Sequence, residues 1–333
     1  MKSQKSKAKS QNRIAIQMVL FFPFVFLILN CSAQQTPQYT QFMLNNYGMN
    51  PAACGVSTNK MEALVGLRRQ WVGFDNPPRT SFFNFNTYFG KRNGLNHAWH
   101  GVGAYWQGDK MGDVIKTDDY YASYTLLLRL DRKGYISFGM AAGARRYSFG
   151  LNDFGTGDPA IISKNIWLYP DFIPGVRFWN NKWTFDLSVK QLYKYKAKQG
   201  GNMIGTDAAL PPHVYFSVSR KWWARSYLLV IQSLHVKYDY ATLPSFDYNM
   251  LAFLNKNFAV GLTYRHLDAV AAVVQFRFDK LVIGLAYDYT IAPYRVGFAN
   301  TQEFMLGIAP SPYAGGANDA KHYRTAECPQ FQY

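Results

Sequence analysis

The chain has 333 residues, a formal net charge of +16 and an aromatic share of 17 %, with 24 Tyr and 25 Phe. A basic balance is typical of nucleic-acid binding, but the export signal described next leaves little opportunity for it, and we expect no nucleic-acid partner. After residue 33 no stretch approaches the roughly 18 apolar residues that a membrane helix needs. These features leave two classes, a large β-rich extracellular protein or an outer-membrane β-barrel.

Residues 1–33 are predicted to be a secretory signal peptide. It begins with five basic residues, Lys2, Lys5, Lys7, Lys9 and Arg13. The apolar run 14–29 follows, and the small residue Ala33 provides a cleavage site after it. Two alternatives stay open, an uncleaved anchor helix and lipidation at Cys31 instead of cleavage after Ala33.

The body of the chain consists of short segments in which apolar and polar residues alternate, as they do in half-buried strands. Residues 83–89, 183–190 and 258–265 show this pattern most clearly. We predict about fourteen strands. They begin near Met61, Ser81, Ala98, Tyr120, Tyr135, Leu168, Trp183, His213, Ser226, Asp247, Phe258, Asp268, Leu281 and Thr301.

The predicted connections alternate in length. Tight ones lie at 131–134, 180–182, 222–225, 255–257 and 279–280. Longer ones lie at 73–79, 108–116, 150–167, 193–211, 239–246 and 291–300, and the short link near His266 is the exception. Short periplasmic turns and longer extracellular loops are typical of transmembrane barrels. We therefore predict an all-β fold, a transmembrane antiparallel β-barrel in the outer membrane.

An even number of strands places both ends of the barrel sequence on the periplasmic side. The predicted parts are a periplasmic N-terminal segment 34–60 with one short helix near 39–47, the barrel 61–310, and a periplasmic tail 311–333. The segment and the tail each hold one cysteine, Cys54 and Cys328. In an oxidising compartment these two could form a disulfide that ties the tail to the segment. The alternative is two unpaired, buried thiols.

Signals for enzymatic chemistry are weak. The histidines lack metal-ligand spacing, and residues 153–158 resemble a calcium loop that has Lys164 where a Glu is needed. The glycine-rich run 200–205 lacks the strand and helix that flank a phosphate-binding turn, and no nucleophile elbow is present. We predict no enzyme, no metal and no cofactor; an embedded hydrolase is the alternative.

The alternation also assigns charged side chains to the lumen. They are Arg68, Arg129, Arg145, Arg177, Asp186, Lys190, Arg265, Arg277, Asp288 and Glu303. Three of these, Arg129, Arg177 and Arg277, lie near tight turns and are predicted to line the periplasmic mouth. They either form ion pairs that stiffen the interior or make a basic mouth that docks an acidic partner or filters anions. The basic and aromatic run 220–225 is interpreted as an interfacial anchor, with partner docking as the alternative.

Three stretches carry a family resemblance: "YTQFMLNNYGMNPAACG" (39–55), "GLRRQWVGFDNPPRTSFFNF" (66–85) and "GLAYDYTIAPYRVGFANTQEFMLGIA" (284–309). Together they resemble the PorP/SprF family of outer-membrane proteins of the type IX secretion and gliding motility machinery. The resemblance implies a barrel that works with the type IX translocon. It also implies support for export and surface retention of large proteins with a type IX C-terminal signal, and contact with a periplasmic peptidoglycan-binding lipoprotein.

From residues and resemblance together we expect a non-catalytic barrel, embedded in outer-membrane lipids, that supports export or surface anchoring of one large adhesin-like protein. The long connections 150–167 and 193–211 are the expected contact sites, because rigid barrels leave recognition to their loops. The alternative is a porin or transporter for small solutes, since a barrel of this size can enclose an aqueous lumen. Inward arginines would then favour anions.

Overall fold

The computed structural model describes residues 37–57, 60–90, 98–112, 115–130, 134–149, 166–192, 198–199, 202–203, 212–225, 228–239, 244–255, 257–278, 280–292 and 300–308. The predicted signal peptide and the predicted tail with Cys328 lie outside these residues, as does the calcium-like run 153–158. No helix in this described part is both long and apolar enough to cross a membrane.

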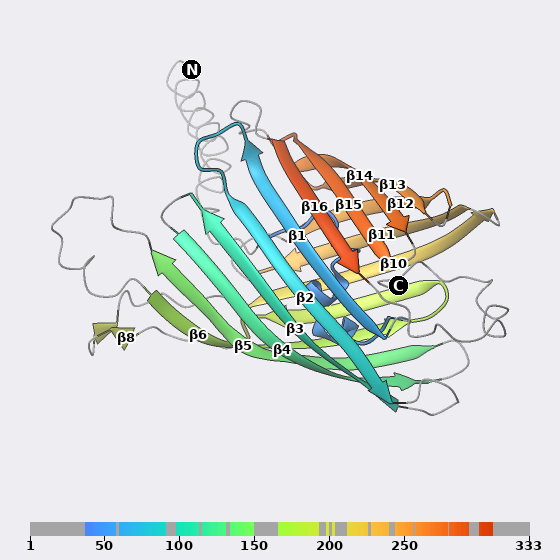
Figure 1. The fold of residues 1–333 in the computed structure, drawn as a ribbon, viewed down its shortest axis with the longest axis horizontal. Coiled ribbons are helices and arrows are strands. Elements are labelled where there is room, and N and C mark those ends of the chain that lie inside the picture. The colour runs from blue at the N-terminus through green and yellow to red at the C-terminus, as the bar shows by residue number, and fades with distance from the viewer. Residues whose placement is uncertain are drawn as a thin grey trace, which may run out of the picture. The chain divides into compact units, whose positions relative to one another are not determined.

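The strands close into one antiparallel barrel in which each barrel strand pairs with the next (Figure 1). The first strand, β1 (Met61–Val72), pairs with both β2 (Arg79–Gly90) and the last strand, β16 (Asn300–Ile308). Closure satisfies the backbone groups that an open sheet would leave at its edges. The prediction of a fourteen-stranded antiparallel barrel is confirmed.

The other barrel strands begin within a few residues of their predicted positions, Tyr120 excepted. They are β3 (Ala98–Met111), β4 (Ile115–Arg129), β5 (Tyr135–Phe149), β6 (Ile166–Trp179), β7 (Trp183–Lys190), β10 (His213–Arg225), β11 (Leu228–Tyr238), β12 (Ser245–Phe253), β13 (Phe258–Arg265), β14 (Ala269–Phe278) and β15 (Leu281–Thr290). A small hairpin, β8 (Lys198–Gln199) with β9 (Asn202–Met203), lies in the connection between β7 and β10.

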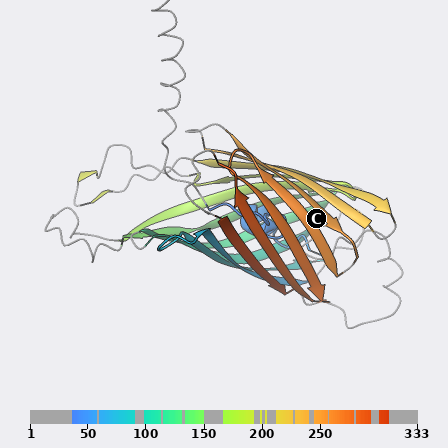
Figure 2. The ribbon, with the colours of Figure 1, turned by 90° about the horizontal axis from the view of Figure 1, so that it is seen from above.

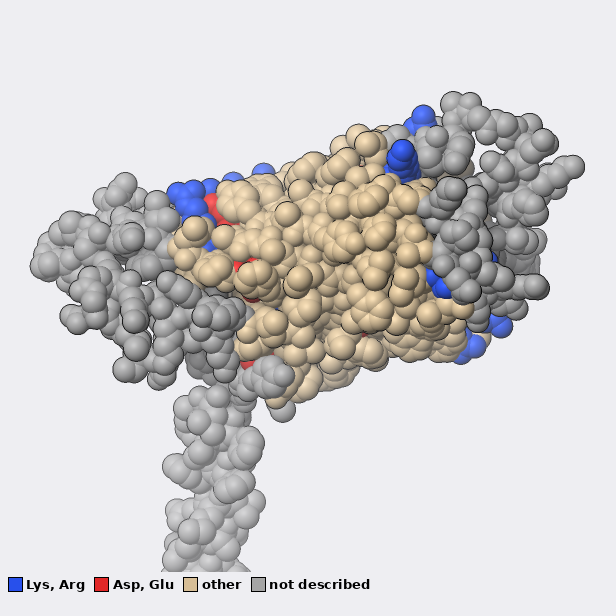
Figure 3. All heavy atoms as spheres, turned by 90° about the horizontal axis from the view of Figure 1, so that it is seen from below, with Lys and Arg blue, Asp and Glu red and all other residues tan. Residues whose placement is uncertain are grey.

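Side chains alternate between an apolar outer face and the lumen along each strand. In β14, for example, Val270, Phe276 and Phe278 are exposed on the outside while Ala271 and Val273 are buried on the inside. On the face drawn in Figure 3, Lys and Arg lie towards the two ends of the barrel and the middle band is nearly free of charge. Such a band suits the hydrocarbon core of an outer membrane.

The two mouths of the barrel differ. At the mouth where β1 begins and β16 ends, here the turn mouth, strands are joined by short connections such as 180–182 and 226–227. At the opposite loop mouth the connections include 150–165 and 191–212. One predicted long loop, 108–116, is mostly strand, because β3 and β4 pair as far as Met111 and Ile115. Water-exposed strand ends need no apolar alternation, so the sequence pattern does not mark them.

The described residues before β1, 37–57, lie inside the barrel rather than at its rim, and we call them the lumen segment (Figure 2). The segment contains a turn at 40–44, a single helical turn α2 (Asn46–Met49) and a 3₁₀ turn η1 (Pro51–Ala53). The predicted helix near 39–47 is therefore shorter and shifted. Asn50 caps η1 by accepting from the Ala52 N–H, and Pro51 suits the first position of a helical turn because it has no N–H to satisfy.

Candidate functional site: the occupied lumen

Apolar side chains of the lumen segment fill the middle of the barrel. Tyr39, Phe42, Leu44 and Tyr47 are all buried in one cluster with lumen-facing residues of the wall. The Tyr39 ring packs edge-on against Phe82 with centroids 5.0 Å apart, and Phe42 stacks on the His235 ring at 5.0 Å. Since burial of one large apolar side chain is worth about 1.5–3 kcal/mol, the segment is firmly held.

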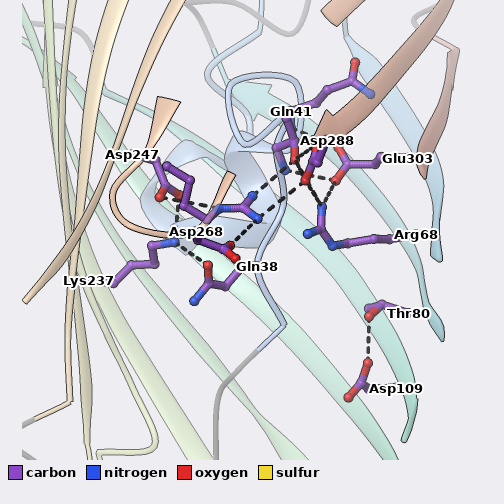
Figure 4. Close-up of polar contacts among 12 residues, drawn as sticks. Gln38, Gln41, Arg68, Thr80, Asp109, Lys237, Asp247, Asp268, Asp288 and Glu303 are labelled. Atoms are coloured by element: carbon purple, nitrogen blue, oxygen red, sulfur yellow. Dashed lines mark hydrogen bonds and ion pairs between the residues drawn. The ribbon is translucent and has the colours of Figure 1, made fainter. Parts of the chain in front are cut away.

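A charged cluster holds the start of the segment near the loop mouth (Figure 4). The Glu303 carboxylate accepts the backbone N–H groups of Thr40 and Gln41, both at 2.9 Å. The Thr40 hydroxyl donates to Asp288 at 2.7 Å and accepts from Arg68 at 3.1 Å and from Arg265 at 3.2 Å. This hydroxyl thus uses its donor and both of its lone pairs. We call Thr40, Arg68, Arg265, Asp288 and Glu303 the Thr40 cluster.

The wall residues of the Thr40 cluster come from four strands, β1, β13, β15 and β16, whose loop-mouth halves converge here. Arg68 is 3.2 Å from both Asp288 and Glu303, and all three side chains are almost fully buried. Arg265 adds contacts to Asp247 at 3.6 Å and to Asp288 at 3.5 Å. Charges this deep persist because each has an opposite charge beside it.

A second polar site holds the middle of the segment. Asn50 donates through Nδ2 to the Asp186 carboxylate at 2.8 Å and to the Val176 carbonyl at 3.0 Å. Arg177 forms a two-bond pair with the same Asp186 carboxylate, at 2.8 and 2.9 Å. Asn50 therefore docks on an ion pair that the wall makes by itself, between β6 and β7.

Towards the turn mouth, side chains of the wall form hydrogen bonds with the main chain of the segment. Five side chains from four strands donate to its carbonyl oxygens. The bonds are Lys190 to Gly48 at 2.9 Å, Ser188 to Met49 at 2.8 Å, Thr125 to Pro51 at 2.8 Å, Ser137 to Ala52 at 2.6 Å and Trp99 to Gly55 at 3.2 Å. Because Lys190 and Ser188 share β7, the donors fall on β3, β4, β5 and β7. Such bonds recognise backbone rather than side-chain identity.

Strand glycines make room for this close approach. A Cβ on Gly139 of β5 would overlap the backbone of Pro51 and Ala52, and one on Gly101 of β3 would overlap the Cys54 carbonyl. Glycine in a strand interior weakens the strand and often marks a place where another backbone comes near. The wall and the segment are therefore fitted to each other along β3 and β5.

The segment itself is uncharged: residues 37–57 contain no Asp, Glu, Lys or Arg. Every ion pair described in the lumen therefore joins one wall residue to another. Besides those already described, Arg145 pairs with Asp119 through two bonds of 2.6 and 2.7 Å, and Lys237 lies 2.7 Å from Asp247. A neutral segment therefore lies among wall residues that form these ion pairs with each other.

Little space is left beside the segment where cavities are described. One cavity near Tyr47, Glu62 and Arg177 and another near Tyr47 and Lys190 each hold about 20 Å³, which is room for one or two water molecules. Within the described ranges no group of His, Cys, Asp and Glu is arranged to hold a metal ion. Beside these cavities the lumen is occupied by the segment.

The predicted inward residues occupy the lumen face. Arg177 and Arg277 are buried near the turn mouth, and Arg129 is partly buried there with its guanidinium 5.7 Å from the Tyr135 ring centroid. The outward residue Arg220 of the run 220–225 stacks on Trp222 at 3.5 Å. The structure thus gives the location of these residues in the barrel. That the turn mouth faces the periplasm, and the roles of these residues, stay predictions.

Cys54 lies in the segment and its side chain is fully buried. Among the described residues it forms no disulfide, and Cys328 is not one of them, so the Cys54–Cys328 pair stays a prediction. Burial raises the pKa of the Cys54 thiol to about 12. The thiol is in contact with the Thr125 hydroxyl of β4.

Sequence reasoning did not foresee that residues 37–57 are enclosed by the barrel. The sequence did contain a signal for this enclosure, because residues 37–57 form a run without charge in a strongly basic chain. Together the closed antiparallel sheet, the apolar outer band and the filled lumen define a plugged outer-membrane β-barrel.

The chain belongs to the PorP/SprF family, since the model of the type IX secretion system membrane protein PorP/SprF matches residues 31–308. No protein with a curated description matches the chain.

Solved outer-membrane channels are similar at low identity. The toluene transporter TbuX of Ralstonia pickettii is 12 % identical with a TM-score of 0.48, over 80 % of this chain and 92 % of that one. The monoaromatic hydrocarbon channel CymD is 13 % identical with a TM-score of 0.47, over 81 % and 91 %. The toluene transporter TodX of Pseudomonas putida is 8 % identical with a TM-score of 0.45, over 82 % and 93 %. The fold described above rests on the strand pairing itself.

Proposed function

We propose that this barrel is a non-catalytic partner of the type IX secretion system that supports export or surface anchoring of one large, adhesin-like protein. The filled lumen is the observation that supports this function over a diffusion pore. A barrel that conducts solutes keeps an aqueous channel, whereas here the lumen segment is packed among side chains from around the whole barrel. Family membership supplies the link to type IX secretion.

The proposed partners contact different mouths of the barrel. An exported protein with a type IX C-terminal signal would contact the loop mouth, where the connections 150–165 and 191–212 are long. The translocon and a periplasmic peptidoglycan-binding lipoprotein would contact the turn mouth, where connections such as 180–182 are short. Outward aromatic and basic residues such as Trp222 and Arg220 would anchor that rim in the lipid headgroups.

The experiment that tests this function is a comparison of surface proteomes between the parent cell and a strain without this protein. We expect selective loss of one or a few large surface proteins, restored by complementation. An unchanged cell surface in the deletion strain would contradict the proposal.

The competing function, an anion-selective porin, predicts steady single-channel conductance from the purified barrel. The lumen argues against it, because Arg68, Arg145 and Arg177 are each neutralised by a wall carboxylate. Stable conductance together with altered small-solute uptake in the deletion strain would favour the porin.

A further inference from the structure

The lumen segment is bound as a ligand is bound, not as a strand is. Its hydrogen bonds to the wall involve side chains, and in the described part of the chain it adds no strand to the barrel sheet. Its carbonyl groups at Met49, Pro51 and Ala52 accept from Ser188, Thr125 and Ser137. A wall that forms hydrogen bonds with backbone groups can bind peptides of more than one sequence.

Departure of the segment would break no ion pair. The segment has no charged side chain, and the described ion pairs join wall residues to each other, as Arg145 does with Asp119 and Arg177 with Asp186. Lys190 differs, because it donates to the Gly48 carbonyl of the segment. In the Thr40 cluster Arg68 would keep both Asp288 and Glu303. Breaking a buried ion pair is strongly destabilising, and this cost does not arise here.

Departure would lose apolar contact together with hydrogen bonds, among them those that Glu303 accepts from the N–H groups of Thr40 and Gln41. The apolar side chains Tyr39, Phe42, Leu44 and Tyr47 are buried among wall side chains. Exposing several such side chains at once is prohibitive without replacement. An incoming chain would have to bring equivalent groups. The tethered segment also competes at millimolar effective concentration, so the replacement must itself be held close to the barrel.

We propose that the lumen is a peptide-binding site, occupied by residues 40–55 of this chain until an uncharged, aromatic-containing segment of the exported protein takes their place. This inference rests on the proposed secretion function and names the part of the barrel that receives the partner. The incoming segment accepts hydrogen bonds at its carbonyl groups from the donors of β4, β5 and β7. It is uncharged like the segment it replaces, because the ion pairs described in the lumen join wall residues to each other.

The first experiment locks the segment to the wall with its own thiol. Thr125→Cys places a second thiol beside Cys54, because the two native side chains are in contact. Cys328→Ser is included so that Cys54 has one partner only. The same variant with Cys54→Ser is the matched control, because it carries the wall substitution without the lock.

Surface levels of the proteins lost from the deletion strain are then measured with and without oxidant, and the extent of locking is read by alkylation and mass spectrometry. We expect oxidation to lower them to the deletion level in the locked variant only, and reductant to restore them. Parental surface levels in fully locked cells would overturn the inference while leaving the proposed function intact. An unchanged surface in the deletion strain would overturn both.

A second measurement does not depend on disulfide formation. An aliphatic diazirine amino acid replaces Ile173, a buried lumen residue beside Met49 and Pro51 in the wall of the cavity near Lys190. Illumination of exporting cells should give an adduct with the exported protein in addition to the adduct within the chain. The matched control carries the same amino acid at Phe172, which is exposed on the outer face. Adducts only within the chain at position 173 would overturn the inference.

Discussion

The two ends of the lumen segment are held by different kinds of interaction. Near the loop mouth, Thr40 and Gln41 are bound by charged groups, with Glu303 on their N–H groups and two arginines on the Thr40 hydroxyl. Near the turn mouth, Pro51 and Ala52 are bound by neutral hydroxyl groups, and glycines open the space.

The contrast separates two tasks. Hydrogen bonds to charged groups are worth about 1.5–3 kcal/mol each and those between neutral groups about 1 kcal/mol. The charged end therefore holds the segment in one position along the lumen. The neutral end binds more weakly and mainly provides space that fits the backbone. Substitutions that weaken one end and spare the other measure this difference.

The largest effect is expected for Glu303→Gln. The amide offers one acceptor oxygen where the carboxylate offered two, and Arg68 loses one of its two carboxylate partners. Loss of a buried pair member costs about 3 kcal/mol, so hydrogen exchange at Thr40 and Gln41 should accelerate roughly 100-fold. Asp75→Asn, on the exposed connection 73–78, is the control and should leave exchange unchanged. Parental exchange in Glu303→Gln would show that the charged end is not the anchor.

The next effect is expected for Gly139→Val, which tests the shape of the neutral end. The new side chain would overlap the backbone of Pro51 and Ala52, and overpacking of this kind costs about 1–3 kcal/mol. Urea titration of the purified barrel should show a lower free energy of unfolding. Ala142→Val on the outer face of the same strand is the control. Equal stability of the two variants would mean that the segment yields easily there.

A smaller effect is expected for Ser137→Ala, which removes one neutral donor to the Ala52 carbonyl. The loss should be about 1 kcal/mol, read as faster hydrogen exchange in η1 and not at Thr40. Ser148→Ala, at an exposed bond to the Lys116 carbonyl, is the matched control. A loss as large as that of Glu303→Gln would abolish the distinction between the two ends.

The last prediction concerns the reactivity of the Cys54 thiol and involves no change in stability. Because the pKa of Cys54 is raised to about 12, the thiolate is scarce below that pH, and the folded protein should resist alkylation at pH 8 and react only as pH approaches 12 or on unfolding. Alkylation after unfolding, with and without reductant, then tests the predicted pair with Cys328. Alkylation of both Cys54 and Cys328 after unfolding without reductant would contradict that pair.

Much of the barrel could be predicted because alternate residues of each strand face two different environments. Lipid on one side and a polar lumen on the other force a period of two, which placed Arg145, Arg177 and Glu303 correctly on the buried face. Which charges meet could not be predicted. The pair Arg145–Asp119 follows from the register of β4 with β5, and a shift of one residue would separate them.

The lumen segment escaped prediction for a different reason. Its burial comes from the wall around it and not from an amphipathic pattern of its own, so residues such as Gln41 and Asn45 read as solvent-exposed loop. The extension of β3 and β4 past Asp109 escaped because strands that continue into water have no apolar face to reveal them.

Enclosure of residues 37–57 also constrains the order of assembly. A closed sheet has no lateral opening, and the segment lies within it while continuing into β1 at the turn mouth. If the wall closed first, a free end would have to thread past the Thr40 cluster in the narrow interior. Pairing of β1 with β16 after the wall has wrapped around the segment avoids that barrier. The seam between the first and last strands is then the last part of the barrel to form, and the segment acts as the core on which the wall assembles.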